Sequence, residues 1–138
     1  MTPTQIDLVQ QTIHLVDVRA LASAFYARAF ERDPSLSAMF AAPRDVQHAR
    51  FATELAEIVG SIRDLDALRS RTGGLGARHY DRGVRAAHYR FMGDVLLETL
   101  GATLGPRWTE EMAAAWAAGY DLIAEAMLAG ALPAPSSH

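Results

Sequence analysis

One histidine stands out among the residues whose type and spacing could do chemistry. His79 ends an apolar run with helical spacing, Gly83 follows closely behind it, and the phenol of Tyr89 comes ten residues after the histidine. A neutral imidazole in such a place can donate a lone pair to a metal ion, and it is a common axial ligand of haem iron. A histidine on an apolar helix face is also an ordinary core residue, so the residues alone leave both interpretations open.

Other kinds of metal centre find little support in the chain. Cysteine is absent, which excludes disulfides, thiolate ligands and thioether-linked haem. His79 and His88 lie nine positions apart across a glycine, which is not the i, i+4 spacing of a helical zinc site. We expect His14 and His88 to lie at the surface or at helix ends.

Length and composition indicate one small domain. The chain has 138 residues, 50% of them hydrophobic, which is enough to bury a core. We expect residues 1–132 to form that domain and residues 133–138 to form a frayed tail. All 13 basic residues are arginines scattered among acids, and the net charge is -3, so we expect no nucleic-acid partner. No segment has the pattern of a signal peptide or membrane span, which predicts a soluble cytoplasmic protein without a membrane partner.

Hydrophobic spacing predicts an all-α chain, because apolar residues recur at helical intervals and alternation with a period of two is absent over any useful length. The cap signal Thr2-Pro3-Thr4-Gln5 predicts where the first helix starts. A second helix is predicted over residues 18–32, before Asp33-Pro34 stops it, and a short turn over residues 35–40 follows. The third helix begins at Arg44 or Asp45.

In the second half of the chain, glycine-containing sites are expected to interrupt or end helices. They are Gly73-Gly74 before His79, Gly83 behind it, Gly101, and Gly105-Pro106. Between these sites a helix is predicted from Tyr89 onward. Trp108-Thr109-Glu110-Glu111 predicts the start of the last helix, because its acids favour the positive end of the helix dipole.

Several motifs, in their order and spacing, match one family. They are Ala24-Phe25-Tyr26 with Phe30, Met39-Phe40, Gln47 with Phe51, Arg78-His79 with Gly83-Val84, Ala87-His88-Tyr89, Gly93-Asp94-Val95-Leu96-Leu97, and Ala115-Trp116 with Tyr120. Over nearly its whole length the chain resembles the bacterial single-domain haemoglobins and the globin module of flavohaemoglobins. The resemblance implies a globin fold, with helices packed around haem b, iron protoporphyrin IX.

The resemblance also assigns roles on both sides of the haem. His79 matches the histidine that ligates the iron, and Phe40 matches the phenylalanine that stacks on the haem. Tyr26 and Gln47 match a distal tyrosine and glutamine, whose hydrogen bonds stabilise bound oxygen by roughly 1–3 kcal/mol and favour it over carbon monoxide. His48 should point about 100° away from Gln47 around the helix, so we expect it to ligate iron only if the register is slipped.

One position departs from the family pattern. Tyr89 matches a tyrosine that, with a glutamate late in the last helix, fixes the iron-bound imidazole. The place of that glutamate is taken by Ala131, and Glu125 comes more than a turn too early. The resemblance therefore implies a mild oxygen binder rather than strong peroxidase-like or fast dioxygenase chemistry. The other cavity positions it implies are Phe51 and Leu55 on the distal wall, with Leu75, Val84, Phe91, Leu96, Tyr120 and Ile123.

Three functions remain open from the sequence. The first is reversible binding of oxygen, and of nitric oxide or carbon monoxide, by a monomer or homodimer. The second is nitric oxide dioxygenase activity, with weak peroxidase activity beside it; the chain has no Gly-rich dinucleotide loop, so turnover requires an external reductase. The third is a haem-free helical interaction or sensor module.

Overall fold

The structure is a computed structural model, and it describes residues 1–40 and 42–131. These residues form α1 (Pro3–Leu15), α2 (Val18–Arg32), η1 (Pro34–Met39), α3 (Arg44–Gly60), α4 (Leu65–Asp81), α5 (Ala86–Leu104), η2 (Gly105–Arg107) and α6 (Glu110–Ala131), where η marks a short 3₁₀ helix. No strand occurs in them, which confirms the all-α prediction. The tail expected over residues 133–138 lies outside the described residues.

The helix ends follow from local chemistry. At the start of α1, the Thr2 hydroxyl accepts from the Gln5 backbone at 3.1 Å, and the Gln5 side chain accepts from the Thr2 backbone at 3.0 Å. The hydroxyl of Thr109 accepts from the Met112 backbone at 3.1 Å and so caps α6. After α4 the chain turns at Gly83, where φ is 94°, a left-handed conformation that favours glycine.

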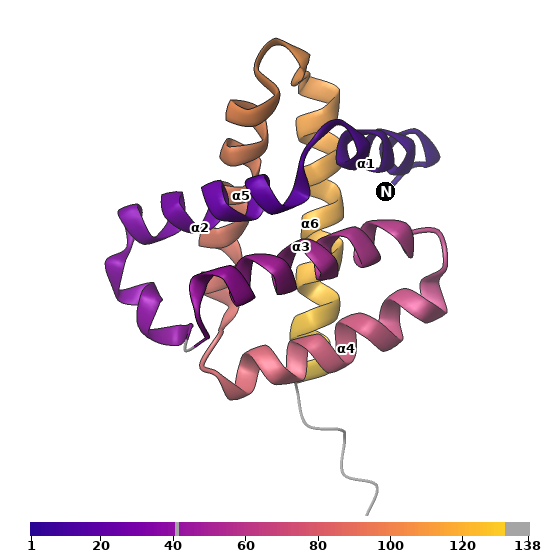
Figure 1. Ribbon diagram of the computed structural model, residues 1–138. Coiled ribbons are helices and arrows are strands. Elements are labelled where there is room, and N and C mark those ends of the chain that lie inside the picture. Colours follow the sequence, from indigo (N-terminus) through magenta and orange to yellow (C-terminus); the bar gives the residue numbers. More distant parts are fainter. Residues whose placement is uncertain (41, 132–138) are drawn as a thin grey trace, which may run out of the picture.

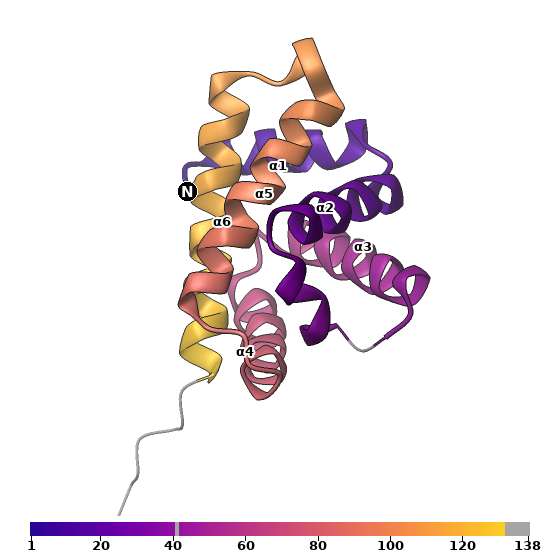
Figure 2. The same cartoon turned by 90° about the vertical axis from the view of Figure 1, so that its left-hand side faces the viewer.

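The arrangement of the helices sets the neighbours of the site. In Figure 1, α3 and α4 cross in front of α6, and in the turned view of Figure 2 α5 and α6 lie side by side. The most extensive packing joins α4 to α6, while α2 packs on both α3 and α5. By contrast, α3 and α4 touch each other only sparsely. The helix with Gln47 and the helix with His79 are therefore neighbours without close backbone packing.

Two of the expected helix breaks do not occur. Gly73-Gly74 lies inside α4, which is continuous, and Gly101 lies inside α5, which ends only at Gly105. For α4 the reason is close packing on α6: a Cβ on Gly130 would lie 2.5 Å from Cα of Gly73, so the two backbones are nearly in contact there. In α5, Gly101 lies against the ring of Trp108, where an added Cβ would be 3.2 Å from the indole. A glycine costs a helix about 1 kcal/mol, and close packing of this kind offsets that cost.

The core lies between α2, α5 and α6. Its fully buried side chains include Leu21, Val95 and Leu100. The buried hydroxyls of Thr72 and Thr99 are satisfied locally, because each donates to the carbonyl four residues earlier, at 2.7 Å. None of the helices within the described ranges has the length and apolar character that a membrane span requires.

Candidate functional site

His79 lies in the last turn of α4, where a backbone carbonyl selects the tautomer of its neutral ring. Its Nδ1 atom lies 2.8 Å from the carbonyl oxygen of Leu75, one turn earlier. A carbonyl oxygen can only accept, so Nδ1 carries the hydrogen and Nε2 keeps its lone pair. Burial lowers the pKa of His79, and the charges of Arg82 and Arg78 act in the same direction against the backbone hydrogen bond. The side chain is therefore a neutral imidazole with one nitrogen free to bind a metal ion.

Two tyrosines support the imidazole from α5 and α6. The ring centroid of Tyr89 lies 6.5 Å from that of His79, with 27° between the ring planes. Tyr120 donates its hydroxyl hydrogen to the carbonyl oxygen of Tyr89 at 2.6 Å. Gly93 allows this approach, since a Cβ there would lie 2.6 Å from Cε1 of Tyr120. Burial raises the pKa of both phenols, so both remain hydrogen-bond donors at neutral pH.

Aromatic rings surround Tyr26 on α2. The centroids of Phe40 and Phe51 lie 5.3 Å and 5.7 Å from that of Tyr26, and both rings meet it edge-on, at 76° and 74°. Only 8% of Tyr26 is exposed, and burial alone raises the pKa of its phenol to about 12. Among the described residues no hydrogen-bond partner of its hydroxyl is seen. The site therefore contains a largely buried tyrosine whose hydroxyl is available to a ligand.

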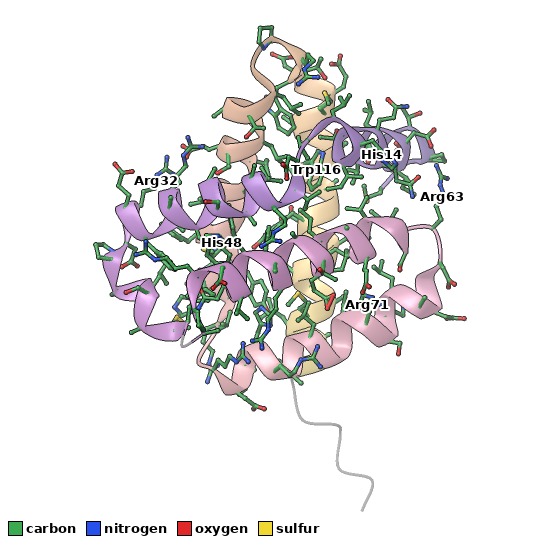
Figure 3. All side chains as sticks on the ribbon, in the orientation of Figure 1. His14, Arg32, His48, Arg63, Arg71 and Trp116 are labelled. Atoms are coloured by element: carbon green, nitrogen blue, oxygen red, sulfur yellow. The ribbon has the colours of Figure 1, made fainter. Side chains whose placement is uncertain are left out.

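Gln47 and His48 come from the first turns of α3. Gln47 is buried, with 8% of its surface exposed, which is unusual for a glutamine near a helix start. His48 is half-buried and stacks on Tyr26, with the ring centroids 5.4 Å apart and 18° between the planes. In Figure 3 the labelled His48 lies between α2 and α3. The structure thus adds His48 to the side chains that contact the phenol.

An arginine joins α3 to α4. Nη1 of Arg71 lies 3.0 Å from a carboxylate oxygen of Glu54 and also pairs with Glu57, so one guanidinium of α4 bridges two acids of α3. Figure 3 labels Arg71 between these two helices. The side chains of Arg71 and Glu54 are 35% and 26% exposed, which protects the pair partly from water. Two predicted haem contacts lie close by in the sequence, since Leu55 directly follows Glu54 and Leu75 comes one helical turn after Arg71. The ion pairs therefore help to set the separation of the two predicted haem walls.

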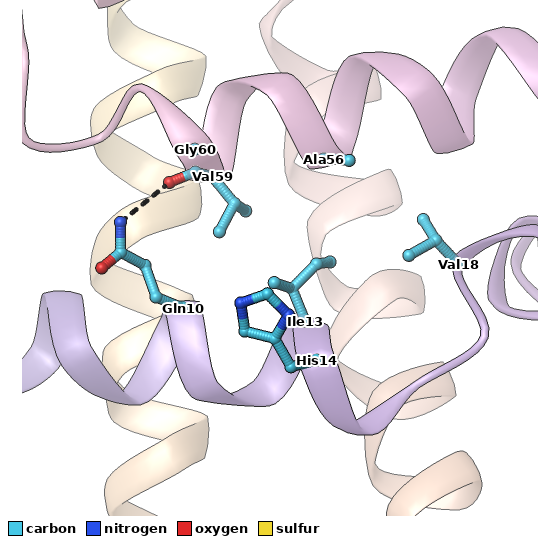
Figure 4. A pocket seen from close by; sticks show the side chains of 7 residues that line it. All are labelled: Gln10, Ile13, His14, Val18, Ala56, Val59 and Gly60. Atoms are coloured by element: carbon cyan, nitrogen blue, oxygen red, sulfur yellow. Dashed lines mark hydrogen bonds between the residues drawn. The ribbon is translucent and has the colours of Figure 1, made fainter.

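Of two surface hollows formed by the described residues, one lies away from these rings and the other borders two of them. One, of about 430 Å³, opens between α1 and α3 and is lined mainly by aliphatic side chains and His14, with the Gln10 amide donating to the Val59 carbonyl at 3.3 Å (Figure 4). It includes none of the predicted site residues, so we do not assign the function to it. The other, of about 230 Å³, lies between α5 and α6 beside Tyr89 and Tyr120.

Comparison with known proteins identifies the family of this chain. The family model described as Globin matches residues 23–127, a range that includes all the rings described above from Tyr26 to Tyr120. The chain belongs to the globin family. This globin is 29% identical over 115 residues to leghemoglobin-1 of Vicia faba, which covers 76% of this chain and 80% of the relative. It is also 30% identical over 117 residues to an anaerobic nitrite reductase of Oryza sativa subsp. indica, which covers 80% of this chain and 81% of the relative.

Solved structures agree with this assignment. A bacterial globin from Campylobacter jejuni superposes with a TM-score of 0.83 at 24% identity, over 94% of this globin and 96% of that chain. An engineered carbene transferase from Rhodothermus marinus, provisionally named as a nitric oxide dioxygenase, superposes with a TM-score of 0.85 at 26% identity, over 95% and 93% of the two chains. These similarities confirm the predicted globin fold and the resemblance to bacterial single-domain globins.

The residues of this globin fit a haem group. In the part of the chain that the structure describes, no cluster of three or more imidazole or carboxylate side chains could hold a metal ion. A lone imidazole such as His79 needs a cofactor that brings the other ligands of the metal, as a porphyrin does. The apolar residues predicted to line the haem pocket, Phe40, Phe51, Leu55 and Leu75, are only partly buried, so they keep apolar surface for a flat cofactor.

The remaining residues predicted to contact the haem lie on α5, on α6 and just after α4. The backbone N–H of Val84 donates to the His79 carbonyl at 3.0 Å and so fixes the end of α4. Phe91 and Leu96 lie on α5, where Leu96 is buried in the core and Phe91 packs against it. Ile123 is half-buried on α6, and its place at the haem stays a prediction.

Three contacts of the site were missed from the sequence. They are the stack of His48 on Tyr26, the bridge from Arg71 to its glutamates, and the hydrogen bond from Tyr120 to Tyr89. Each joins different helices, so no local periodicity indicates it. The one signal available was the i, i+3 spacing of Glu54 and Glu57, which lets a single cation meet both.

Proposed function

We propose that this globin holds haem b through Nε2 of His79 and binds oxygen reversibly, with nitric oxide and carbon monoxide as further ligands. The observation that supports it best is the hydrogen bond from Nδ1 of His79 to Leu75, because it leaves Nε2 as the basic nitrogen. Haem iron, when bound, supplies the site at which a diatomic gas coordinates.

Tyr26 and Gln47 give the pocket its preference for oxygen. The phenol of Tyr26 is buried and protonated at neutral pH, so it can donate a hydrogen bond to a gas that acquires negative charge on binding. The amide of Gln47, on a residue that is also 8% exposed, is a second donor. Carbon monoxide gains little from either donor because it acquires little charge. The rings of Phe40 and Phe51 enclose the phenol and limit the access of water.

A direct experiment tests haem binding. The purified protein, loaded with haemin, should show a Soret band that is lost in His79→Ala and restored when imidazole is added to His79→Gly. His14→Ala is the matched control, because His14 is exposed and distant from the predicted site. A Soret band in His79→Ala equal to that of the parent protein would refute the assignment of the ligand.

Nitric oxide dioxygenase activity is the second candidate, favoured by the Rhodothermus marinus neighbour at 26% identity. The reaction combines oxygen, nitric oxide and one electron to give nitrate, so each turnover needs a reductant. An external reductase is the partner we expect. Mixing the oxygenated protein with nitric oxide should give one equivalent of nitrate, and NADH should sustain turnover only after a reductase is added. An oxygenated protein that does not react with nitric oxide excludes this activity.

A further inference from the structure

The contact between Tyr26 and His48 crosses from α2 to α3. The two rings are nearly parallel, with 18° between their planes and 5.4 Å between their centroids. Such a geometry is attractive for aromatic pairs and is worth more than the area it buries. The resemblance to bacterial haemoglobins gives His48 no role.

The other rings around Tyr26 contact it differently. Phe40 and Phe51 meet it edge-on, while Phe30, on the same helix, is tilted at 34° with its centroid at 5.8 Å. Among the aromatic contacts of Tyr26, His48 supplies the most nearly parallel one, and it is the one polar ring among them. Without His48, the remaining aromatic contacts of Tyr26 are edge-on or tilted, at 34° to 76°, and no near-parallel ring limits rotation about the Cα–Cβ bond of the tyrosine. The stack with His48 restricts that rotation.

The direction of the Tyr26 hydroxyl depends on this packing. The hydroxyl makes no hydrogen bond to a described residue, so the contacts of the ring determine where it points. A shift of the ring changes the distance from the hydroxyl to any ligand, and hydrogen bonds weaken steeply with poor geometry. What holds the ring therefore controls how well the phenol can donate.

We propose that His48 is a positioning residue for Tyr26: by stacking on the phenol it aims the hydroxyl at the bound gas and slows the release of oxygen. This inference rests on the proposed function. The imidazole acts here through its flat ring, with no contact to the gas or the iron.

Two substitutions separate the ring from its nitrogens. His48→Ala removes the stack and should raise the oxygen dissociation rate about five-fold, the size expected for one aromatic pair. His48→Phe keeps a flat ring in the same place and should restore the rate to within about two-fold of the parent protein. If His48→Phe releases oxygen as fast as His48→Ala, a nitrogen of the imidazole matters, and the inference is wrong.

A double-mutant cycle tests whether the effect passes through the phenol. In a Tyr26→Phe background there is no hydroxyl to aim, so adding His48→Ala should change the dissociation rate by less than about two-fold. A full additional effect in that background would mean that His48 acts on the gas independently of Tyr26. Circular dichroism of each variant checks that the helices are intact.

A spectroscopic readout tests the stack without oxygen kinetics. In the diamagnetic carbon monoxide form, the NMR shifts of the Tyr26 ring protons should move in His48→Ala and return toward their parent values in His48→Phe. Ring shifts unaffected by either substitution would overturn the inference. If the parent protein binds no haem, the proposed function fails and this inference fails with it. A normal Soret band with an unchanged dissociation rate in His48→Ala overturns the inference alone.

Discussion

Replacing Tyr26 with phenylalanine isolates the hydroxyl from the rest of the side chain. The ring contacts with Phe40, Phe51 and His48 remain, so the pocket keeps its shape. A hydrogen bond to a charged acceptor contributes about 1.5–3 kcal/mol, and each 1.36 kcal/mol corresponds to a factor of ten in rate. Because Tyr26 is only 8% exposed, water can replace the lost donor only poorly. We therefore expect oxygen to dissociate about 10- to 150-fold faster from Tyr26→Phe.

The same substitution should leave the folded protein almost unaffected. No hydrogen bond of this hydroxyl to another described residue is lost, so the free energy of unfolding without ligand should change by less than about 0.5 kcal/mol. Tyr120→Phe is the matched control, because its hydroxyl does donate to the Tyr89 carbonyl, at 2.6 Å. That variant should lose about 1 kcal/mol or more of stability and change oxygen release much less than Tyr26→Phe does.

Stopped-flow displacement of oxygen by carbon monoxide measures the dissociation rates, and chemical denaturation measures the stabilities. Gln47→Ala should also release oxygen faster than the parent protein, but by a smaller factor than Tyr26→Phe. A dissociation rate within two-fold of the parent in Tyr26→Phe would show that the phenol does not donate to the gas. The distal assignment would then pass to another donor.

Further expectations concern haem retention, packing and pH. Removing the ligand in His79→Gly should abolish haem retention in a transfer assay to a haem acceptor, and free imidazole should restore it. Arg71→Gln removes the bridge between α3 and α4 and should speed haem loss several-fold, with a smaller salt dependence than the parent; equal rates at every salt concentration would contradict this. Gly76→Ala forces α4 away from α6 and should lower the free energy of unfolding by about 2 kcal/mol or more. In Gly73→Ala the added methyl meets nothing within 4 Å, so chemical denaturation should show unchanged or slightly higher stability. Burial raises the pKa of Tyr26 to about 12, so at alkaline pH the folded chain keeps a proton that the unfolded chain loses. By pH 11 the free energy of unfolding of the parent protein should therefore fall by about 1.4 kcal/mol more than that of Tyr26→Phe. Parallel pH profiles of the two proteins would contradict this.

Short-range rules were sufficient for most of the fold. The predicted bounds of the second helix, residues 18–32, are those of α2, and the capping box at Thr2 forms as its sequence indicates. Both depend on residues a few positions apart. The glycine pair at 73–74 was misread as a break because glycine has low helix propensity. What holds the helix together there is contact with α6, from more than fifty residues later, and no local pattern contains that information.

The candidate site also contains residues that the sequence could indicate and a contact that it could not. His79 could be singled out because an imidazole, an apolar run and a glycine turn are close in sequence, and Tyr26 and Gln47 because a family resemblance carried them. The stack on His48 could not be found, since the helical angle from Gln47 gave its direction around α3 but not what α2 presents there. A side chain's neighbours on another helix depend on how the two helices cross, and this crossing is set by the whole core.

The resemblance implies that this chain lacks the glutamate that other members carry late in the last helix. The hydrogen bonds around His79 fit that prediction. Its Nδ1–H donates to a backbone carbonyl, and the nearby Tyr89 is held through its own carbonyl by Tyr120. Among the hydrogen bonds seen in residues 1–40 and 42–131, none joins a carboxylate to either His79 or Tyr89. A carboxylate partner would draw the proton and make the imidazole more basic, whereas a neutral carbonyl does so only weakly. We propose that a weakly donating imidazole on one side of the haem and a protonated phenol on the other would favour retention of oxygen over cleavage of the oxygen–oxygen bond.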